Sequence, residues 1–418
     1  MKYESFKLLY DLYFERTGGS ENELKAANIL KDECEKFGVS AVIEDFDIDG
    51  YKIKNAKLSF SDKTLNFNYV GVGVSGSTDS NGITGEFVYI DSLEALELYD
   101  VNNKICLIYG KKASHKMYKT LVQKGCVGMI LAIGNLYKDN SEVDLDPYQL
   151  RELDYTLGKI PGVAISGQDA EKLIIANPKY ATITLSQDEY TKKSRNVVAT
   201  IPGTKKPEEI IAFTAHYDSV PYSKGAYDNG TGSVTIMQLL AYFSEHKPDR
   251  TLKFIWCGSE EMGLLGSKAY TKAHQEELEN YLLNINVDMT GVTIGFDIAR
   301  VTAEEALVNY INYLGMEVGF PIKVSQGVYS SDSTPFADNG VPSLSFARLA
   351  PQGGATIHSH DDVMGHLSEA NYYRTCDFIT TFSERIINSV KVPVKRIIPQ
   401  NMKDEIDYYY SRKERPEK

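Results

Sequence analysis

Apolar and polar residues follow one another along the second half of the chain in a pattern that predicts alternating strands and helices. Four continuous apolar runs predict strands that are covered on both faces of a sheet: 196–201, 209–215, 251–257 and 282–288. Between the second and third runs, apolar residues such as Ile236, Leu239 and Phe243 recur at helical spacing and predict a helix over about 229–246. This alternation predicts a three-layer α/β domain.

The first 190 residues show three successive patterns: a helix, a stretch rich in β-formers and a smaller α/β unit. Ser20 with Glu23 forms a capping box, and Gly38 ends the helical stripe that follows. Residues from 41 to about 87 are rich in β-formers. Four further strands are predicted at 104–110, 127–133, 162–166 and 181–186. Helices are predicted between them, near 112–124 and 168–176. This segment is predicted to be a second, smaller α/β unit.

Gly71, Gly73 and Gly76 spell the G-x-G-x-x-G pattern of dinucleotide-binding sites. That site requires a strand before the glycines and a helix directly after them. Here the glycines lead into another strand at about 86–91, so the pattern indicates a glycine-rich crossing and no Rossmann site.

Composition and charge narrow the class of protein. The 418 residues are 42% hydrophobic and 24% charged, which is typical of a globular protein. A net charge of −12 disfavours nucleic acid and anionic membranes as the main partner. No apolar run is long enough to cross a bilayer, and Glu4 interrupts the start, so no signal peptide is expected. Five widely spaced cysteines without a C-x-x-C pair predict reduced, buried thiols and a cytoplasmic protein.

Side chains that can bind metal ions follow three of the predicted strands. They are His216, the pair Glu260 and Glu261, and Asp288, and two more stand in loops, Asp228 and His358. Strand ends that meet at one edge of an α/β sheet are where such sheets bind ligands. Five ligands plus a spare carboxylate predict a two-metal site, because so many carboxylates would repel one another without cations. Imidazole and carboxylate without thiolate favour Zn²⁺, with Co²⁺ or Mn²⁺ as substitutes.

Two further roles follow from residue types. Asp218 can accept the second ring N–H of His216 and so fix its tautomer. Of the neighbours Glu260 and Glu261, one can bind metal while the other takes a proton from a metal-activated water.

Taken together, these motifs resemble those of the dizinc aminopeptidase family that also contains glutamate carboxypeptidase. The similar segments occur in the family's order and are Arg16–Ser20, His216–Ser219, Gly225–Gly232, Ser259–Ser267, Asn286–Met289, Ser331–Asp332 with Pro335–Phe336, and His358–Ser359 with Asp362. The resemblance covers residues 1 to about 60 and 195 to about 390. It implies a three-layer mixed-sheet zinc-peptidase domain of the phosphorylase/hydrolase-like kind.

The resemblance also implies a role for each residue. Asp228 would bridge two zinc ions, His216 and Asp288 would complete one site, and Glu261 and His358 would complete the other. Glu260 would be the general base, assisted by Asp218. The peptide bond after the bridging aspartate, here Asp228–Asn229, is typically cis in this family.

Three positions depart from the family pattern or leave a choice. Both His358 and His360 are available, and His358 is preferred because Asp362 follows it four residues later. The family's histidine before Pro-Phe is replaced by Ser333. Many members place a tyrosine near this loop to stabilise the tetrahedral intermediate, and Tyr329 is the candidate.

The resemblance predicts four segments, which are peptidase domain 1–65, protease-associated insert 66–190, peptidase domain 191–392 and C-terminal extension 393–418. The predicted function is that of an aminopeptidase acting on short peptides. A carboxypeptidase, dipeptidase or amidohydrolase, a one-zinc glutaminyl cyclase and a non-catalytic receptor-like protein stay open as alternatives. A homo-oligomer is also possible.

Overall fold

The computed structural model describes residues 3–110, 112–145 and 148–415. The chain divides into two compact units. Unit 1 comprises residues 1–48 and 193–418, and unit 2 comprises residues 49–192. The boundaries inferred from the sequence were 65/66 and 190/191, so the first of them lies later in the chain than the structural boundary.

Unit 1 contains a mixed sheet whose strands run in the order β12-β11-β13-β10-β8-β9-β7. Their bounds are β7 Tyr180–Ile201, β8 Lys206–His216, β9 Arg250–Cys257, β10 Tyr281–Val287, β11 Phe296–Thr302, β12 Ile322–Gln326 and β13 Ser343–Leu349. The central strands β13, β10, β8 and β9 run parallel to one another, whereas β7 and β11 pair antiparallel with them. β8, β9 and β10 are predicted from their apolar runs, and the residues of β9, β10 and the last seven positions of β8 are almost all buried.

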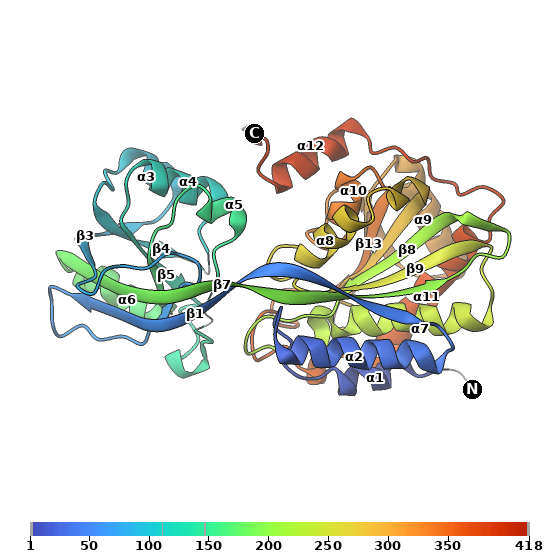
Figure 1. Cartoon of the computed structure of the whole chain (residues 1–418), viewed down its shortest axis with the longest axis horizontal. Coiled ribbons are helices and arrows are strands. Elements are labelled where there is room, and N and C mark those ends of the chain that lie inside the picture. The colour runs from blue at the N-terminus through green and yellow to red at the C-terminus, as the bar shows by residue number, and fades with distance from the viewer. Residues whose placement is uncertain (1–2, 111, 146–147, 416–418) are drawn as a thin grey trace. The chain divides into compact units, whose positions relative to one another are not determined.

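Helices cover both faces of this sheet (Figure 1). They are α1 Ser5–Asp11, α2 Glu21–Lys36, α7 Thr231–Glu245, α8 Leu265–Ala273, α9 Glu305–Val318, α10 Ser333–Asp338, α11 Glu369–Ile387 and α12 Gln400–Tyr409, with short helical turns η2 Ala226–Gly230, η3 Glu277–Asn280 and η4 Met364–His366. Helix α7 contacts β8, β9 and β10 on one face, and α8 and α10 lie on the other. The predicted three-layer mixed-sheet α/β fold is confirmed.

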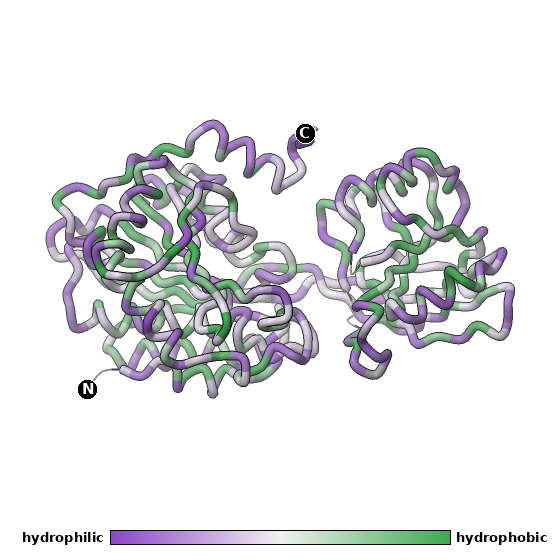
Figure 2. Tube along the Cα trace, turned by 180° about the vertical axis from the view of Figure 1, so that it is seen from behind, coloured by the Kyte–Doolittle hydropathy of each residue, from purple (hydrophilic) through white to green (hydrophobic). Residues whose placement is uncertain are grey.

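Unit 2 contains a smaller sheet in the order β7-β3-β4-β5-β6-β2, with β3 to β6 parallel. Its elements are β2 Val70–Gly71, β3 Ile83–Ile90, α3 Leu93–Leu98, β4 Lys104–Tyr109, α4 His115–Gln123, β5 Gly128–Ile133, η1 Asn140–Glu142, α5 Glu152–Tyr155, β6 Gly162–Ser166 and α6 Gly167–Ala176. Figure 2 shows hydrophobic residues concentrated along these strands. The glycine-rich segment contributes the two-residue strand β2, and the next element after it is strand β3.

Two long strands, β1 (Ala41–Phe60) and β7, run through both units and pair with each other. Gly50 lies inside β1, where a Cβ atom would come within 2.8 Å of the Tyr190 ring. A glycine in a β-rich segment usually indicates a break or bulge, but here it makes room for an aromatic ring from the partner strand. The first boundary therefore falls inside a continuous strand, where no turn residue marks it.

The predicted helix start at Ser20 is present, with one change of partner. The Ser20 hydroxyl accepts a hydrogen bond from the Glu23 backbone N–H at 3.1 Å, and Gly38 has φ +69° just beyond the helix end. The Glu23 carboxylate, however, accepts from the Gly19 N–H at 2.9 Å and from the Ser194 hydroxyl at 2.5 Å. Burial raises the pKa of this carboxyl to about 8, although the Ser194 hydrogen bond opposes the shift.

This raised pKa predicts a pH-dependent stability. Because the folded-state pKa of Glu23 lies above the unfolded value of 4.5, unfolding free energy is expected to fall as pH rises from 4.5 to 8. The Glu23→Gln variant removes that loss, so its stability relative to wild type should increase by on the order of 1 kcal/mol or more between about pH 5.5 and about pH 8.5. Urea unfolding at both pH values measures the change. The control is Glu35→Gln on the exposed side of α2, and an equal pH trend in both variants would contradict the assignment.

The C-terminal segment, predicted to be a surface extension, contains an ordered helix in unit 1. Ile398, Met402 and Ile406 are nearly completely buried against Ala337 of α10. All five cysteines are buried and unpaired by disulfides. Across the parts of the chain that the structure describes, no helix combines the length and apolarity needed to span a membrane.

Candidate metal centre

The carboxyl ends of the central strands of unit 1 place four of the predicted residues at one edge of the sheet. β8 ends at His216, which is in register with Cys257 at the end of β9. Glu260 and Glu261 follow β9 three and four residues later, and Asp288 directly follows β10. Because β10, β8 and β9 are adjacent and parallel, these ends meet as the sequence predicts.

Two loops bring the remaining residues to this edge. Asp228 lies in the η2 turn just before α7, and His358 lies in the segment after β13, which is parallel to β10. Two groups of potential ligand atoms result, each with its atoms within 4.8 Å of one another. Group 1 is His216, Glu260 and Asp288, and group 2 is Asp228, Glu261 and His358.

Asp228 connects the two groups. Its Oδ1 lies 3.1 Å from Nε2 of His216, and its Oδ2 lies 3.0 Å from Nε2 of His358. The His358 Nε2 also lies 3.1 Å from Glu261 Oε2. One carboxylate therefore reaches a histidine of each group with a different oxygen, which is the geometry that a ligand shared by two cations needs.

Several carboxylates lie close together in the centre, and their negative charges shift the pKa values of the groups around them. Burial disfavours a charge on His216, but Glu260, Asp218 and other carboxylates outweigh burial and raise its pKa well above the usual range. The pKa of His358 is raised in the same way to about 11, chiefly by Glu261 against the effect of burial. Burial, and repulsion from Glu261 among others, raise the pKa of Glu260 well above its usual value. Cations in the centre would relieve this repulsion.

Two buried aspartates orient the ligand-bearing backbone. Asp218 accepts hydrogen bonds from the backbone N–H groups of Glu260 and Glu261 at 3.0 and 3.2 Å, and its Oδ1 lies 3.5 Å from Nδ1 of His216. Asp362 accepts from the backbone N–H groups of Tyr227 and Asp228 at 2.8 and 3.0 Å. Each carboxylate therefore fixes the backbone of a segment that supplies a ligand.

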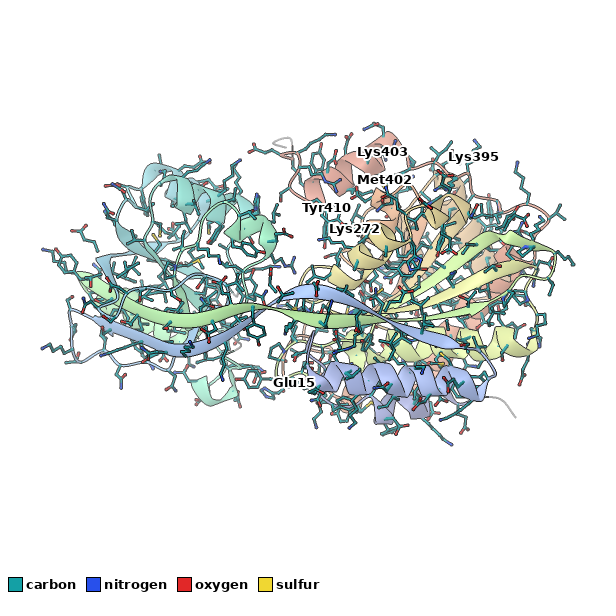
Figure 3. All side chains as sticks on the ribbon, viewed as in Figure 1. Glu15, Lys272, Lys395, Met402, Lys403 and Tyr410 are labelled. Atoms are coloured by element: carbon teal, nitrogen blue, oxygen red, sulfur yellow. The ribbon has the colours of Figure 1, made fainter. Side chains whose placement is uncertain are left out.

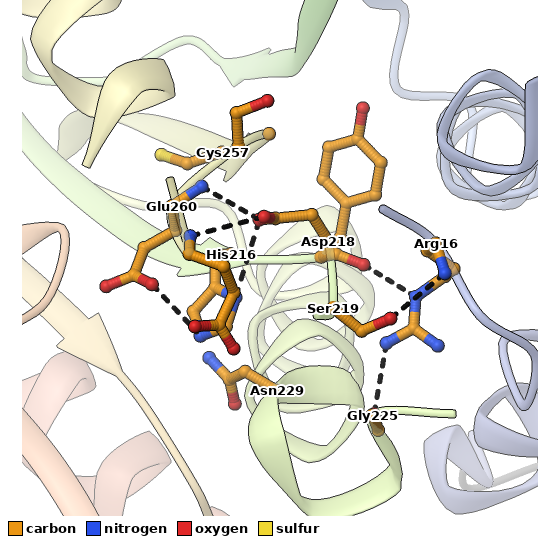
Figure 4. Close-up of polar contacts among 12 residues, drawn as sticks. Arg16, His216, Asp218, Ser219, Gly225, Asn229, Cys257 and Glu260 are labelled. Carbon is orange, nitrogen blue, oxygen red and sulfur yellow. Dashed lines mark hydrogen bonds and ion pairs between the residues drawn. The ribbon is translucent and has the colours of Figure 1, made fainter. Parts of the chain in front are cut away.

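A buried arginine joins the loops from the opposite side (Figure 4). Arg16 is inaccessible to solvent, and its guanidinium donates to the carbonyl oxygens of Tyr217 at 2.6 Å, Lys224 at 2.6 Å and Gly225 at 3.0 Å. It also donates to Leu12 and Phe14. Burial lowers its pKa to about 10, against the attraction of Asp218.

Asn229 links the η2 turn to the end of β10. Its Nδ2 donates to the carbonyl of Val287 at 2.9 Å, and its Oδ1 accepts from the N–H groups of Gly232 and Met289 at 2.9 and 3.0 Å. The Asp228–Asn229 peptide bond is cis, as the resemblance implies.

The structure also decides where the ambiguous positions lie. His358 is in group 2, whereas Nε2 of His360 lies 3.3 Å from Asp361. The hydroxyl of Ser333, in α10, is 2.8 Å from that of Ser345 in β13, and Ser333 belongs to neither group of potential ligands. Tyr329 is half-buried and close enough to Asp288 that this carboxylate adds to burial in raising the phenol pKa.

Some residues that shape the centre have no role that the sequence alone predicts. In the sequence, Asp362 serves only to choose His358 over His360, and Arg16 and Asn229 appear only as members of motifs without a role of their own. Their hydrogen-bond partners are mostly backbone groups, and the identity of the residues does not reveal which backbone groups will be partners. For Arg16, the one available signal is its place two residues before Gly18 and Gly19, within the segment Arg16–Ser20 that resembles the family.

Comparisons with known proteins give relatives for the part of the chain that carries the two groups. Residues 196–383 match peptidase family M28. The chain is 31% identical to aminopeptidase YwaD of Bacillus subtilis over 58% of its own length, and that match spans 55% of the Bacillus protein. It is 26% identical to carboxypeptidase Q of Bos taurus over 87% of this chain and 80% of the bovine protein.

Solved structures share the fold. A zinc aminopeptidase from Bacillus subtilis aligns with a TM-score of 0.76 at 23% identity, covering 94% of this chain and 97% of the other. An aminopeptidase from Aneurinibacillus sp. strain AM-1 aligns with a TM-score of 0.73 at 21% identity, covering 94% and 95%. Residues 196–383, which match the model of peptidase family M28, carry every side chain of groups 1 and 2.

Proposed function

We propose that the protein is a two-zinc aminopeptidase that releases N-terminal residues from short peptides. The observation that carries this proposal is the position of Asp228, whose two carboxylate oxygens lie 3.1 and 3.0 Å from histidines of the two groups. A single ion would need only one of these two oxygens as a ligand, whereas two ions would use both.

The donor set fits zinc. Imidazole and carboxylate ligands without thiolate suit Zn²⁺. Among the described residues, Oε1 of Glu261 and Oδ1 of Asp288 are buried without a hydrogen-bond partner, as expected for atoms that face a cation. His216, Asp228 and Asp288 would hold one ion, and Asp228, Glu261 and His358 the other. Bound zinc would supply Lewis acidity toward the scissile carbonyl and lower the pKa of a water molecule.

Glu260 is the residue proposed to move protons. Its carboxylate lies 4.0 Å from Nε2 of His216 and the residue is 8% exposed, so it borders the centre and still reaches solvent. A general base works best when its pKa lies near the working pH, and the raised pKa of Glu260 moves it in that direction. Glu260 would take the proton of the attacking water and deliver it to the leaving amine.

Tyr329 is proposed to stabilise the oxyanion. Burial and the nearby carboxylates Asp288 and Asp228 raise its pKa well above the usual value, so the phenol keeps its proton at neutral pH. A protonated phenol can donate a hydrogen bond to the negative oxygen of a tetrahedral intermediate.

The charges around the centre favour a free amino terminus over a free carboxylate. Besides Arg16, two arginines near the motifs are engaged elsewhere: Arg348 donates to Asp297 at 2.7 Å and Arg300 to Ser325 at 2.8 Å. The carboxylates of groups 1 and 2 would attract a protonated α-amino group. The carboxypeptidase Q relatives, which match 87% of the chain, support the second candidate, an enzyme that recognises the substrate carboxylate.

The deciding experiment compares dipeptides with free and N-acetylated amino termini, with zinc counted in the same preparation. We expect hydrolysis of the free dipeptide only, about two zinc ions per chain, and loss of activity with a chelator. Preference for the acetylated dipeptide would support the carboxypeptidase. One zinc ion per chain would favour the glutaminyl cyclase, and inactivity of the zinc-loaded protein would favour the receptor-like protein.

We further propose that unit 2 corresponds to a protease-associated insert and that the enzyme works in the cytoplasm on short peptides. The five cysteines are buried and form no disulfide, which supports a reducing compartment. The net charge of −12 supports neither nucleic acid nor an anionic membrane as a partner.

A further inference from the structure

The C-terminal helix α12 packs beside the loop 327–332, which carries Tyr329. Ile398, Met402 and Ile406 form a small apolar cluster with Ala337 of α10, and Val328 from the loop packs against that cluster. Tyr410 completes the contact, with the Lys268 ammonium 5.1 Å from the centre of its ring. Figure 3 labels Met402 on α12 and Tyr410 directly after the end of this helix. The cluster is separate from the main core of unit 1.

Two polar contacts reinforce this packing. The Tyr409 hydroxyl lies 3.0 Å from the hydroxyl of Ser330, which is directly beside Tyr329 in the chain. Arg412, just beyond the helix, donates to both carboxylate oxygens of Asp338 at 2.7 and 2.5 Å. The helix is therefore connected both to the loop and to the end of α10.

On its other side the loop is fixed to the sheet and to the metal centre. The Gly327 N–H donates to the Val301 carbonyl at 3.0 Å, and Asn286, two residues before Asp288, donates to the Ser331 hydroxyl at 3.0 Å. The Tyr329 carbonyl accepts from the Thr334 hydroxyl of α10 at 2.7 Å. A shift of α10 or of Ser330 would therefore move the Tyr329 backbone.

We propose that α12 is a positioning element of the active site, which acts through Tyr409 and Ile406 to hold loop 327–332 and so keep the Tyr329 phenol in place. The catalytic part of this inference rests on the proposed function. Helix α12 lies outside residues 196–383, so the family match does not account for it. The apolar cluster fixes α10, and the Tyr409–Ser330 contact fixes the loop itself.

The first test releases the helix. Ile406→Asp places a charge in the apolar cluster and is expected to lower kcat roughly 10-fold or more, since a misplacement of about 1 Å can cost on the order of 10²-fold. KM and zinc content should stay unchanged. Hydrogen exchange of peptides covering 327–338 should become faster, while peptides from β10 stay as in wild type. Tyr409→Phe should lower kcat less, and Tyr408→Phe on the same helix serves as the matched control.

The second test asks whether the effect passes through Tyr329. If α12 acts by positioning this phenol, Ile406→Asp combined with Tyr329→Phe should be no slower than Tyr329→Phe alone. Fully multiplicative losses would overturn the proposal, as would unchanged kcat in both Ile406→Asp and Tyr409→Phe. If Ile406→Asp fails to fold, Tyr409→Phe combined with Tyr329→Phe supplies the same comparison.

Hydrogen exchange separates this inference from the proposed function. If the zinc-loaded wild type cleaves no peptide, the proposed function fails, and exchange still judges whether α12 holds the loop. Faster exchange at 327–338 in Ile406→Asp or Tyr409→Phe would then support the holding role. Unchanged exchange at this segment would overturn it whatever the activity.

Discussion

Replacing Glu260 by glutamine is expected to lower kcat by roughly 10³-fold, because a positioned general base contributes on the order of 10² to 10⁴ in rate. Glutamine has nearly the same shape but an amide oxygen that does not take up a proton at neutral pH. The backbone N–H of residue 260 would still donate to Asp218 at 3.0 Å, so the fold of the loop should persist. Steady-state kinetics with a free dipeptide, together with zinc analysis, checks this result.

The neighbouring residue provides the control. Glu261→Gln weakens a ligand of group 2, so its activity should fall through lower zinc content and recover as zinc is added. Glu260→Gln should keep its zinc and should not recover. Wild-type kcat in Glu260→Gln would remove Glu260 from its proposed role, and so would recovery with zinc.

Replacing Arg16 by methionine is expected to lower the free energy of unfolding by about 3 kcal/mol or more, since several buried carbonyl groups would lose their donors at about 1 to 3 kcal/mol each. The affected carbonyls include those of Tyr217, which follows His216, and Gly225, which precedes the η2 turn. The midpoint of urea unfolding, read at a constant m-value, measures the loss.

An exposed arginine offers a matched comparison. Arg385 makes a two-pronged ion pair with Glu317 at the surface, and Arg385→Met should cost less than about 1 kcal/mol. Equal losses for the two variants would show that burial and the carbonyl contacts of Arg16 do not matter. Arg16→Lys is expected to fall between them, because an ammonium cannot reach all the carbonyls that the guanidinium does.

The candidate metal ligands can be picked out from the sequence because they are of ligand-forming residue types and most of them stand at the ends of predicted strands. Parallel strands put their carboxyl ends at one edge, so His216, Glu261 and Asp288 are expected to meet on the strength of the strand pattern alone. The resemblance adds the order of the motifs and the cis bond after Asp228. These features depend on residue type and on local pattern, which a single sequence contains.

Other features are hidden from the sequence because they depend on the backbone or on distant segments. Gly50 suggests a break in β1, yet Tyr190 from the partner strand makes it part of a continuous strand. Glu23 satisfies the capping-box pattern, but its carboxylate finds Ser194 far along the chain. The apolar face of α12 can be identified only once the structure shows that Met402 and Ile406 pack against α10. Pairings of this kind cannot be predicted from local periodicity.

The wide separation of the ligands along the chain also has a consequence for the order of folding. Asp228, Glu261 and His358 come from three widely separated segments, which lie before α7, after β9 and after β13. Contacts between residues so far apart in sequence are expected to form late, because the entropy of closing a long loop is lost before the contact contributes any favourable free energy. We therefore expect the centre to be completed late in folding, so that a partly folded chain would lack a complete site.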